Sequence, residues 1–426
     1  MPRRTDPEPI PAACSAEPAS HGGEAVTLQR RLTLPLLTFY GLGSIVGAGI
    51  YALIGEIAGY AGLQSPAAFL LAAVVAAFSG LSYAELSARL PRSAGEAAYV
   101  EHAFDRRWLT GLTGWAVVAT GIVSAATIAN AFSGYLGVFV HWPAQLTVTL
   151  FVLICGAVAA WGIAESAWMA ALMTWLAIAG LLAIMYLAGD AWTQLPEVWP
   201  QMLPRDGDAW VGVCLGAFLA FYAFIGFEDM VNVAEEVVEP RRNLPLAILL
   251  ALLVATLLYV AVALLAVLAL PLEQLVDSQA PLADILAQGG RASPRLIALL
   301  SLLALASSAL AQMIMASRVA FGLAGQGLAP AVFARINRRS RTPLMATITI
   351  TLLVLVMALW LPMRTLAELT SVVILLIFAL VNIALLVIKV RGETDIDTFR
   401  VPLFVPVCGA ALCIGFVAFR ILWSAA

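Results

Sequence analysis

The stretch Gly41-Leu42-Gly43-Ser44-Ile45-Val46-Gly47-Ala48-Gly49-Ile50-Tyr51 lies inside an apolar segment that is long enough to cross a membrane. Its four glycines fall within nine residues, and each glycine weakens a helix interior by roughly 1 kcal/mol relative to alanine. We therefore expect the helix to break in this stretch. Close packing against a neighbouring helix is the alternative explanation for the glycines.

A second interrupted segment lies five apolar runs further along the chain. It reads Phe224-Ile225-Gly226-Phe227, and Glu228 and Asp229 follow at once. Acidic residues inside a membrane segment are costly and usually mark a function. Because five is an odd number, the two segments cross the membrane in opposite directions. Such a pair of breaks predicts an inverted-repeat transporter with a central binding site.

The chemistry of a broken helix indicates what such a site binds. Unwinding frees backbone N–H and C=O groups, which must line a cavity because lipid cannot satisfy them. The freed N–H groups at the start of the second half-helix suit a carboxylate. The freed carbonyls suit an ammonium group or a cation. A site that offers both suits an α-amino acid.

The composition agrees with a membrane protein and excludes several other classes. Of the 426 residues, 62% are hydrophobic and 12% are charged, whereas a soluble domain has about 25% charged residues. The solvent of most of the chain must be the lipid bilayer. A net charge of −3 gives no sign of a nucleic-acid partner. The five cysteines form no CxxC pair and the three histidines lie outside the apolar cores, so we expect no metal site.

Apolar runs of about 20 residues are long enough to cross a ~30 Å hydrocarbon core. They predict an all-α integral membrane protein with about 11 transmembrane helices, near 35–59, 66–90, 108–139, 145–162, 168–189, 209–236, 245–270, 294–325, 343–361, 366–390 and 403–424. Most of the 23 Lys and Arg residues fall on one side if the N-terminus is cytoplasmic. We expect a multi-pass protein of the cytoplasmic (inner) membrane with its C-terminus outside.

Several ordered motifs resemble amino acid permeases of the amino acid–polyamine–organocation (APC) superfamily. The motifs are the first break, Ser82–Glu96, Tyr222–Asp229 with the loop that follows it, Ala316–Pro330, and Arg400-Val401-Pro402. The resemblance covers about 30–424. It implies a five-plus-five inverted-repeat fold with broken helices 1 and 6. The family usually has twelve helices, so this chain departs from it by one.

The domain boundaries follow from the composition and the resemblance together. Residues 1–30 are rich in Pro, Ala and Glu and predict a disordered cytoplasmic tail. Residues 31–426 form a single transmembrane domain. Its repeats span about 33–190 and about 208–391, and an extra helix spans about 403–424. A homodimer is compatible with the resemblance.

The resemblance also implies which residues bind the substrate. The carboxylate is expected to meet backbone N–H groups that match Gly47, Ala48 and Gly49. The ammonium group is expected to meet carbonyls that match Ile45, Tyr222, Ala223 and Ile225, with Gly226 in the same break. Walls or gates of the site are expected from Phe224 and Phe227, for which ordinary apolar packing is the alternative.

Coupling of transport to an ion is left open by the sequence. Glu228 is the candidate for a proton carrier, and capping of the second half of helix six is its alternative role. Some proton-coupled members carry a lysine in the fifth helix, where this chain has Ala177. Ser307 and Ser308 offer oxygens to a sodium ion, or simply pack between helices. We expect no cofactor beyond a coupling ion, H⁺ or Na⁺.

The function predicted from these features is secondary active transport of amino acids by alternating access, as a symporter or an exchanger. A polyamine or other organic-cation carrier is one alternative, with Glu228 and Asp229 binding the substrate. A non-transporting amino acid sensor is the other. An enzyme is not expected, because the apolar runs hold no nucleophile–base or metal constellation. The sequence does not indicate which amino acid is moved.

Overall fold

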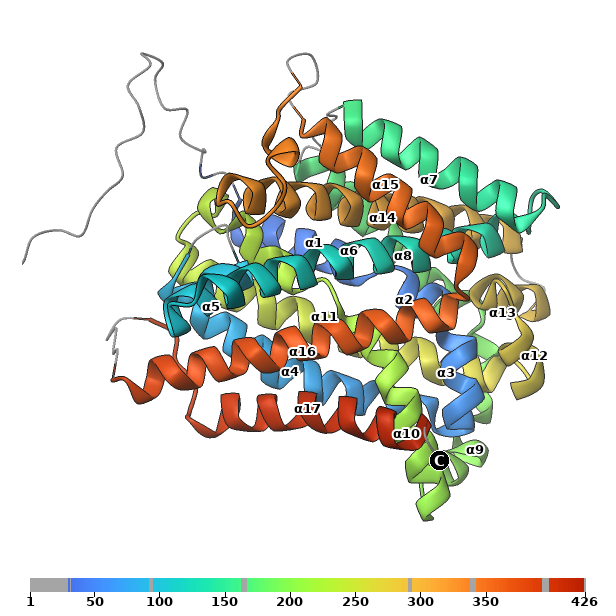
Figure 1. Ribbon diagram of the computed structural model, residues 1–426. Coiled ribbons are helices and arrows are strands. Elements are labelled where there is room, and N and C mark those ends of the chain that lie inside the picture. Colours follow the sequence, from blue (N-terminus) through green and yellow to red (C-terminus); the bar gives the residue numbers. More distant parts are fainter. Residues whose placement is uncertain are drawn as a thin grey trace, which may run out of the picture.

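The computed structural model describes residues 30, 32–91, 95–161, 167–289, 293–337, 342–392 and 398–424. The predicted tail at 1–30 therefore lies almost wholly outside the described residues. Helices account for the described fold, and the described residues form only an isolated β-bridge in place of strands. Figure 1 shows most of the long helices running side by side along one direction.

The elements follow in this order: α1 (Leu34–Ile45), α2 (Ala48–Ala52), α3 (Ile54–Ala61), η1 (Gly62–Gln64), α4 (Ser65–Arg89), α5 (Gly95–Phe104), α6 (Arg107–Leu136), α7 (Ala144–Trp161), α8 (Ala167–Leu187), η2 (Gly189–Gln194), α9 (Leu195–Met202), α10 (Gly207–Ala220), η3 (Phe221–Phe224), η4 (Glu228–Glu236), α11 (Pro240–Ala269), α12 (Leu272–Asp277), α13 (Pro281–Gly289), α14 (Pro294–Gly325), η5 (Ala331–Ala334), α15 (Leu344–Trp360), α16 (Met363–Val390) and α17 (Phe404–Ser424). The prefix α marks α-helices and η marks 3₁₀-helices. Each of the eleven apolar runs coincides with one or more of these helices, which confirms an all-α membrane fold.

Length and apolar character identify nine membrane-spanning helices among the described residues. A tenth span results if the bent pair Leu172–Leu187 and Gly189–Met202 is counted as one. The eleventh run is α15, which has 17 residues and so reaches only the short end of the range for a spanning helix. The helix α11 begins five residues earlier than predicted, at Pro240, because proline is favoured at the first helical position.

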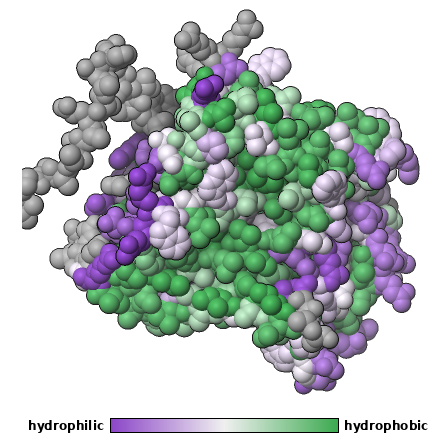
Figure 2. Space-filling view, viewed as in Figure 1, coloured by the Kyte–Doolittle hydropathy of each residue, from purple (hydrophilic) through white to green (hydrophobic). Residues whose placement is uncertain are grey.

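The surface of the bundle is that of a protein surrounded by lipid. Figure 2 shows apolar side chains over the middle of the face in view, with hydrophilic residues gathered toward its two ends. Many large apolar side chains are exposed on the bundle; Leu257 is 63% exposed and Trp360 is 80% exposed. In water such a surface would drive association, so the chain is a multi-pass membrane protein.

The two broken spans lie side by side and run in opposite directions. The start of the first span meets the end of the sixth, because Leu32 N–H donates to the carbonyl of Glu236 at 3.0 Å. At the opposite end, a Cβ built on Gly212 of α10 would lie 2.6 Å from the carbonyl oxygen of Tyr60. Midway, Gly226 approaches Ser44. The predicted opposite orientation is therefore confirmed, and the two breaks face each other.

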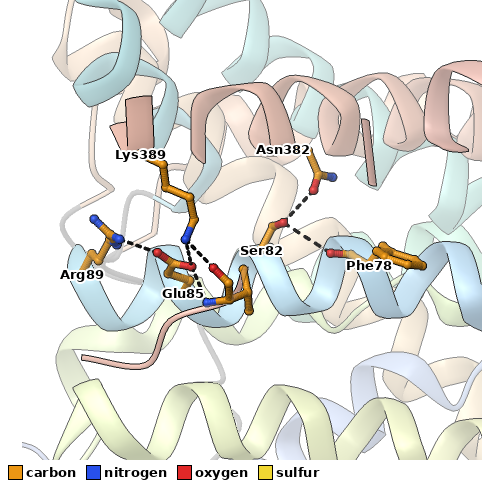
Figure 3. Close-up of polar contacts among 7 residues, drawn as sticks. Phe78, Ser82, Glu85, Arg89, Asn382 and Lys389 are labelled. Atoms are coloured by element: carbon orange, nitrogen blue, oxygen red, sulfur yellow. Dashed lines mark hydrogen bonds and ion pairs between the residues drawn. The ribbon is translucent and has the colours of Figure 1, made fainter. Parts of the chain in front are cut away.

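A buried ion-pair cluster, here called the Glu85 clasp, ties the end of the bundle that carries α5. The Glu85 side chain is fully buried and binds Arg89 in the last turn of the same helix. It also accepts hydrogen bonds from Lys389 Nζ on α16 and from Val401 N–H just before α17, each at 2.7 Å (Figure 3). Lys389 Nζ in turn donates to the Val401 carbonyl at 2.6 Å. One carboxylate thus fastens α4, α16 and the segment before α17.

A second charged cluster, here called the Glu368 clasp, closes the opposite end, which carries α9. Glu368 on α16 binds Arg420 of α17 at 2.8 Å and Arg364 at 3.4 Å. The hydroxyl of Tyr60 on α3 donates to the same carboxylate at 3.1 Å. The Arg364 guanidinium lies 4.2 Å from the centre of the Tyr60 ring and 3.9 Å from Glu56. The outer part of the first broken span is thereby held against α16 and α17.

Candidate functional site

A pocket lies between the two breaks, in the middle of the bundle. It contains about 300 Å³ of empty space and is lined by Ser44, Ile45, Gly47, Gly49, Ser124, Ile128, Tyr222, Ile225, Ser308 and Gln312. These residues come from the first break, from α6, from the second break and from α14. This space includes volume that is open to solvent, so the enclosed part is much smaller than 300 Å³.

The first break separates α1 from α2 by two residues, Val46 and Gly47. Gly47 is extended, with φ −142° and ψ −145°, and precedes the first residue of α2 without any side-chain cap. The carbonyl of Ile45, which α1 leaves free at its end, accepts a hydrogen bond from the buried Tyr259 hydroxyl at 2.7 Å. A carbonyl has two lone pairs, so Ile45 keeps one acceptor position for a ligand.

Two glycines of the first break are required by close neighbours. A Cβ on Gly49 would overlap the Cα of Ala223 in the second break, and a Cβ on Gly47 would lie 2.9 Å from Ser308 Oγ on α14. The glycines therefore permit the packing that the sequence offered as an alternative. They also expose backbone to the pocket, so both explanations hold for the same residues.

The second break is built around Gly226. Ile225 leaves η3 in an extended conformation, and Gly226 has a φ of +126°, which side chains other than glycine rarely adopt. A Cβ there would also lie 2.5 Å from the Ser44 carbonyl. The N–H of Gly226 donates to Glu228 Oε2 at 2.8 Å. The Glu228 carboxylate thus binds the backbone just before η4, whose N-cap has no side-chain hydrogen bond. Its capping role and its role as a proton carrier both stay predictions.

The second half of the sixth span differs from the sequence expectation of an ordinary helix. Residues Glu228–Glu236 form a 3₁₀-helix. This segment combines the positive φ of Gly226 at its entry with several polar side chains, and neither favours a regular α-helix. The tighter 3₁₀ geometry carries only poor intrahelical hydrogen bonds. Glu228 and Asp229 are nevertheless buried, at 6% and 7% exposure.

Some of the predicted binding residues line the pocket, and others lie near it without lining it. Ile45, Gly47, Gly49, Tyr222 and Ile225 line the pocket. Other predicted residues lie close by without lining it: Ala48 at the first position of α2, Ala223 against Gly49, and Gly226 against Ser44.

The two predicted wall or gate residues lie among aromatic rings. The ring of Phe224 packs against Tyr259 at 5.3 Å between centroids. The ring of Phe227 packs against Tyr83 at 5.5 Å and against Phe378 at 5.1 Å. Neither phenylalanine is among the residues that line the pocket. Their packing alternative is therefore visible, and the gating role stays a prediction.

Four lining residues were not assigned to the site from the sequence: Ser44, Ser124, Ile128 and Gln312. Ser124 Oγ lies 3.0 Å from the hydroxyl of Tyr222, so α6 contributes a polar wall. Gln312 is the only glutamine in the apolar run of α14. A lone amide in a membrane helix is expensive to bury, and this is the sequence signal that could have identified it. Ser308, considered for sodium, lies at the pocket beside Gly47.

The position where some proton-coupled permeases carry a lysine is also defined. The carbonyl of Ala177 on α8 accepts a hydrogen bond from the hydroxyl of Tyr51 at 2.9 Å. The backbone carbonyl of Tyr51 accepts a hydrogen bond from the hydroxyl of Tyr135 on α6 at 2.5 Å. Two hydrogen bonds from tyrosine hydroxyls to backbone carbonyls therefore link the first span to α8 and α6 near Ala177.

Comparison with known proteins agrees with this architecture. A family model described as amino acid permease matches residues 32–425. The vacuolar cationic amino acid transporter 2 of Arabidopsis thaliana is 30% identical over 401 residues, which cover 88% of this chain and 62% of that protein. The branched-chain amino acid permease of Bacillus subtilis (strain 168) is 29% identical over 426 residues, covering 95% and 90%.

The methylthioribose transporter of the same bacterium is 26% identical over 423 residues, covering 94% of this chain and 90% of the transporter. The chain spans less than two thirds of the length of the plant relatives that it matches. The names of these relatives include cationic and branched-chain amino acids and a sugar derivative, so relationship alone does not select a substrate.

Proposed function

Since the chain belongs to the amino acid permease family, we propose that it moves amino acids across a membrane by alternating access, as a symporter or an exchanger. The observation that carries this proposal is the pocket that two facing, oppositely oriented breaks line together. Backbone groups freed by both breaks meet there, which is the arrangement typical of a transporter site. The family is one of permeases rather than enzymes.

The lining of the pocket favours a zwitterionic amino acid. All the lining side chains are apolar or uncharged, so a substrate's carboxylate and ammonium groups would be bound by backbone groups. In that arrangement the N–H groups of Gly47, Ala48 and Gly49 face the carboxylate. The Ile45 carbonyl, with its remaining lone pair, supports binding of the ammonium group.

A carrier of organic cations is the second candidate, and one observation favours it. Glu228 and Asp229 are buried beside the second break, and negative charge near a pocket attracts cations. Lysine, ornithine and putrescine are the test compounds for this candidate. Inhibition of uptake by putrescine but by no neutral amino acid would select it over the leading proposal.

The experiment that tests the proposal is uptake by the purified protein in liposomes. We expect a labelled neutral amino acid to exchange against the same unlabelled amino acid inside, and protein-free liposomes to show no exchange. Methylthioribose and putrescine belong in the same panel. If no amino acid in a complete panel exchanges or accumulates, the proposed substrate class is wrong.

Replacing Tyr259 by phenylalanine is expected to raise the KM for uptake about fivefold. The change removes the hydroxyl that fixes the Ile45 carbonyl, and one such hydrogen bond is worth about 1 kcal/mol. Tyr186→Phe is the matched control, because Tyr186 is 83% exposed on the surface of the bundle. Equal KM values for the two variants would contradict the proposal that the Ile45 carbonyl, as Tyr259 positions it, binds the substrate.

The proposed location is the cytoplasmic membrane with the N-terminus inside. The support is the distribution of basic residues, of which Arg89, Arg107, Arg242 and Lys389 lie at the α5 end. In this orientation the Glu368 clasp closes the external end. A phosphatase fused to the C-terminus, which folds only outside the cytoplasm, is expected to be active, and an inactive fusion would reverse the orientation.

A further inference from the structure

Three buried carboxyl groups gather where α5 packs against the second break. Glu96 on α5 is 3% exposed, and Glu228 and Asp229 on η4 are 6% and 7% exposed. The two elements are in close contact, since a Cβ on Gly95 would lie 2.6 Å from Asn232 Oδ1. Electrostatic repulsion acts between Glu228 and each of the other two, and between Glu96 and Asp229.

Among the described residues, the hydrogen-bond partners of the three carboxyl groups are neutral. Glu96 Oε1 accepts from the Tyr83 hydroxyl at 3.2 Å, and Glu228 Oε2 accepts from Gly226 N–H at 2.8 Å. The Ser44 side chain lies near Asp229, and Asp229 Oδ2 accepts from Gln312 Nε2 at 3.5 Å.

Four basic side chains on the packed elements pair elsewhere. Arg89 and Lys389 bind Glu85, Arg107 donates to the carbonyl of Gln326, and Arg242 pairs with Glu239. Throughout the described ranges, no ion pair reaches Glu96, Glu228 or Asp229. The other titratable groups that interact with Glu96 are the hydroxyls of Tyr83 and Tyr99.

A cluster of this kind cannot keep three negative charges. Removing a carboxylate from water without a counter-charge is costly, and neighbouring carboxylates raise the cost further. Burial, followed by the nearby Asp229, raises the pKa of Glu96 from 4.5 to about 7. The buried cluster therefore favours a bound proton as the pH falls toward neutral.

The cluster touches the pocket through two side chains. Ser44 and Gln312 both line the pocket and both approach Asp229. Gln312 is buried, with only 7% exposure, and its side-chain Oε1 has no hydrogen-bond partner among the described residues. Leaving a buried acceptor unsatisfied is unfavourable, so this oxygen is available to accept a hydrogen bond from a ligand in the pocket.

We propose that Glu96, Glu228 and Asp229 form a shared proton site that is linked to the pocket through Ser44 and Gln312, so that the substrate crosses the membrane together with a proton. The proposal rests on the proposed transport function and names its coupling ion. Loading forms one O–H bond on a carboxylate and takes the proton from solvent. Hydration of the cluster when the bundle opens lets the proton return to solvent, because ionised carboxylates are then no longer buried.

Glu96→Gln separates coupling from transport itself. With a gradient of one pH unit, acidic outside, the unmodified protein is expected to accumulate substrate up to about tenfold, the limit for one coupled proton. The E96Q variant is expected to lose this accumulation, while exchange against preloaded substrate persists. Glu101→Gln, an exposed acid on the same helix, is the matched control and should accumulate like the unmodified protein.

The pH dependence of stability provides a second measurement that does not need transport. A carboxyl group whose pKa is higher in the folded state binds more protons there, so its contribution to stability falls as pH rises from about 4.5 to about 7. The thermal unfolding midpoint in detergent should fall over this interval. The fall should be smaller in E96Q and unchanged in E101Q.

The outcomes distinguish the two proposals. Exchange without any response to the pH gradient, or E96Q behaving like E101Q in both measurements, would overturn the proton site and leave the transport function standing. No exchange by the unmodified protein would overturn the transport function. The slope of unfolding midpoint against pH would then still report on the carboxyl cluster.

Discussion

Replacing Gly49 by alanine is expected to lower amino acid uptake at least about fivefold, and the same change at Gly59 is expected to leave it intact. A Cβ on Gly49 would overlap backbone and side-chain atoms of Ala223. A backbone atom cannot rotate away as the end of a flexible side chain can. The added methyl must therefore push the two breaks apart at the point where they line the pocket together.

The size of this effect follows from the cost of overpacking. An extra methyl in a tightly packed interior costs roughly 1–3 kcal/mol, which corresponds to about 5–150-fold in a binding equilibrium. The same displacement also changes the spacing of the backbone groups that bind the substrate. We expect KM to rise and the maximal rate to fall together.

Gly59→Ala is a close control, because Gly59 lies in the same broken span. Its Cβ would lie 3.7 Å from Val276 Cγ1, an ordinary van der Waals contact. Uptake into liposomes measured at several substrate concentrations compares the two variants. Similar uptake by G49A and G59A would show that the close approach of the two breaks is not needed for binding.

Replacing Glu85 by alanine is expected to destabilise the protein by about 3–5 kcal/mol, the cost of breaking a buried ion pair by removing one partner. The change removes the carboxylate that pairs with Lys389 Nζ and Arg89, whose side chains are only 12% and 9% exposed. It also leaves the N–H of Val401 without its carboxylate partner. A large drop in the thermal unfolding midpoint in detergent is the expected readout.

Glu239→Ala is the matched control for the Glu85 clasp. Glu239 faces Arg242 at 3.9 Å, and both side chains are largely exposed, at 67% and 77%. An exposed pair of this kind contributes about 0–1 kcal/mol. If E85A and E239A unfold at the same temperature, the clasp does not hold α4, α16 and the segment before α17 together.

The membrane architecture was predictable because its signals are local. Apolar runs report directly on the lipid environment, and the clusters at 41–49 and at Gly226 report on backbone that cannot stay helical. The short helices α5, α9, α12 and α13 were not predicted. They are short and lie between the apolar runs, and their helical state depends on packing against neighbouring spans.

The candidate site was only partly predictable, because its members come from distant spans. The glycine-rich break is visible in the local sequence. Gln312 is recognised as a site residue only in the folded structure, where α14 packs beside the breaks. Glu96 belonged to a recognised motif, but its contact with Asp229 depends on how α5 folds back. Glu85 belongs to the same motif, and its partners, Arg89 in its own helix and Lys389 on α16, depend on how α16 packs against α4.

Lys389 is the only lysine of the chain, and the Glu85 clasp holds its ammonium group between a carboxylate and a carbonyl. A protonated, enclosed amine is a poor nucleophile toward acylating reagents. The protein therefore carries a single built-in chemical reporter besides its α-amino group. The rate at which amine-selective labels modify Lys389 would measure how often this corner of the bundle opens, without any engineered substitution.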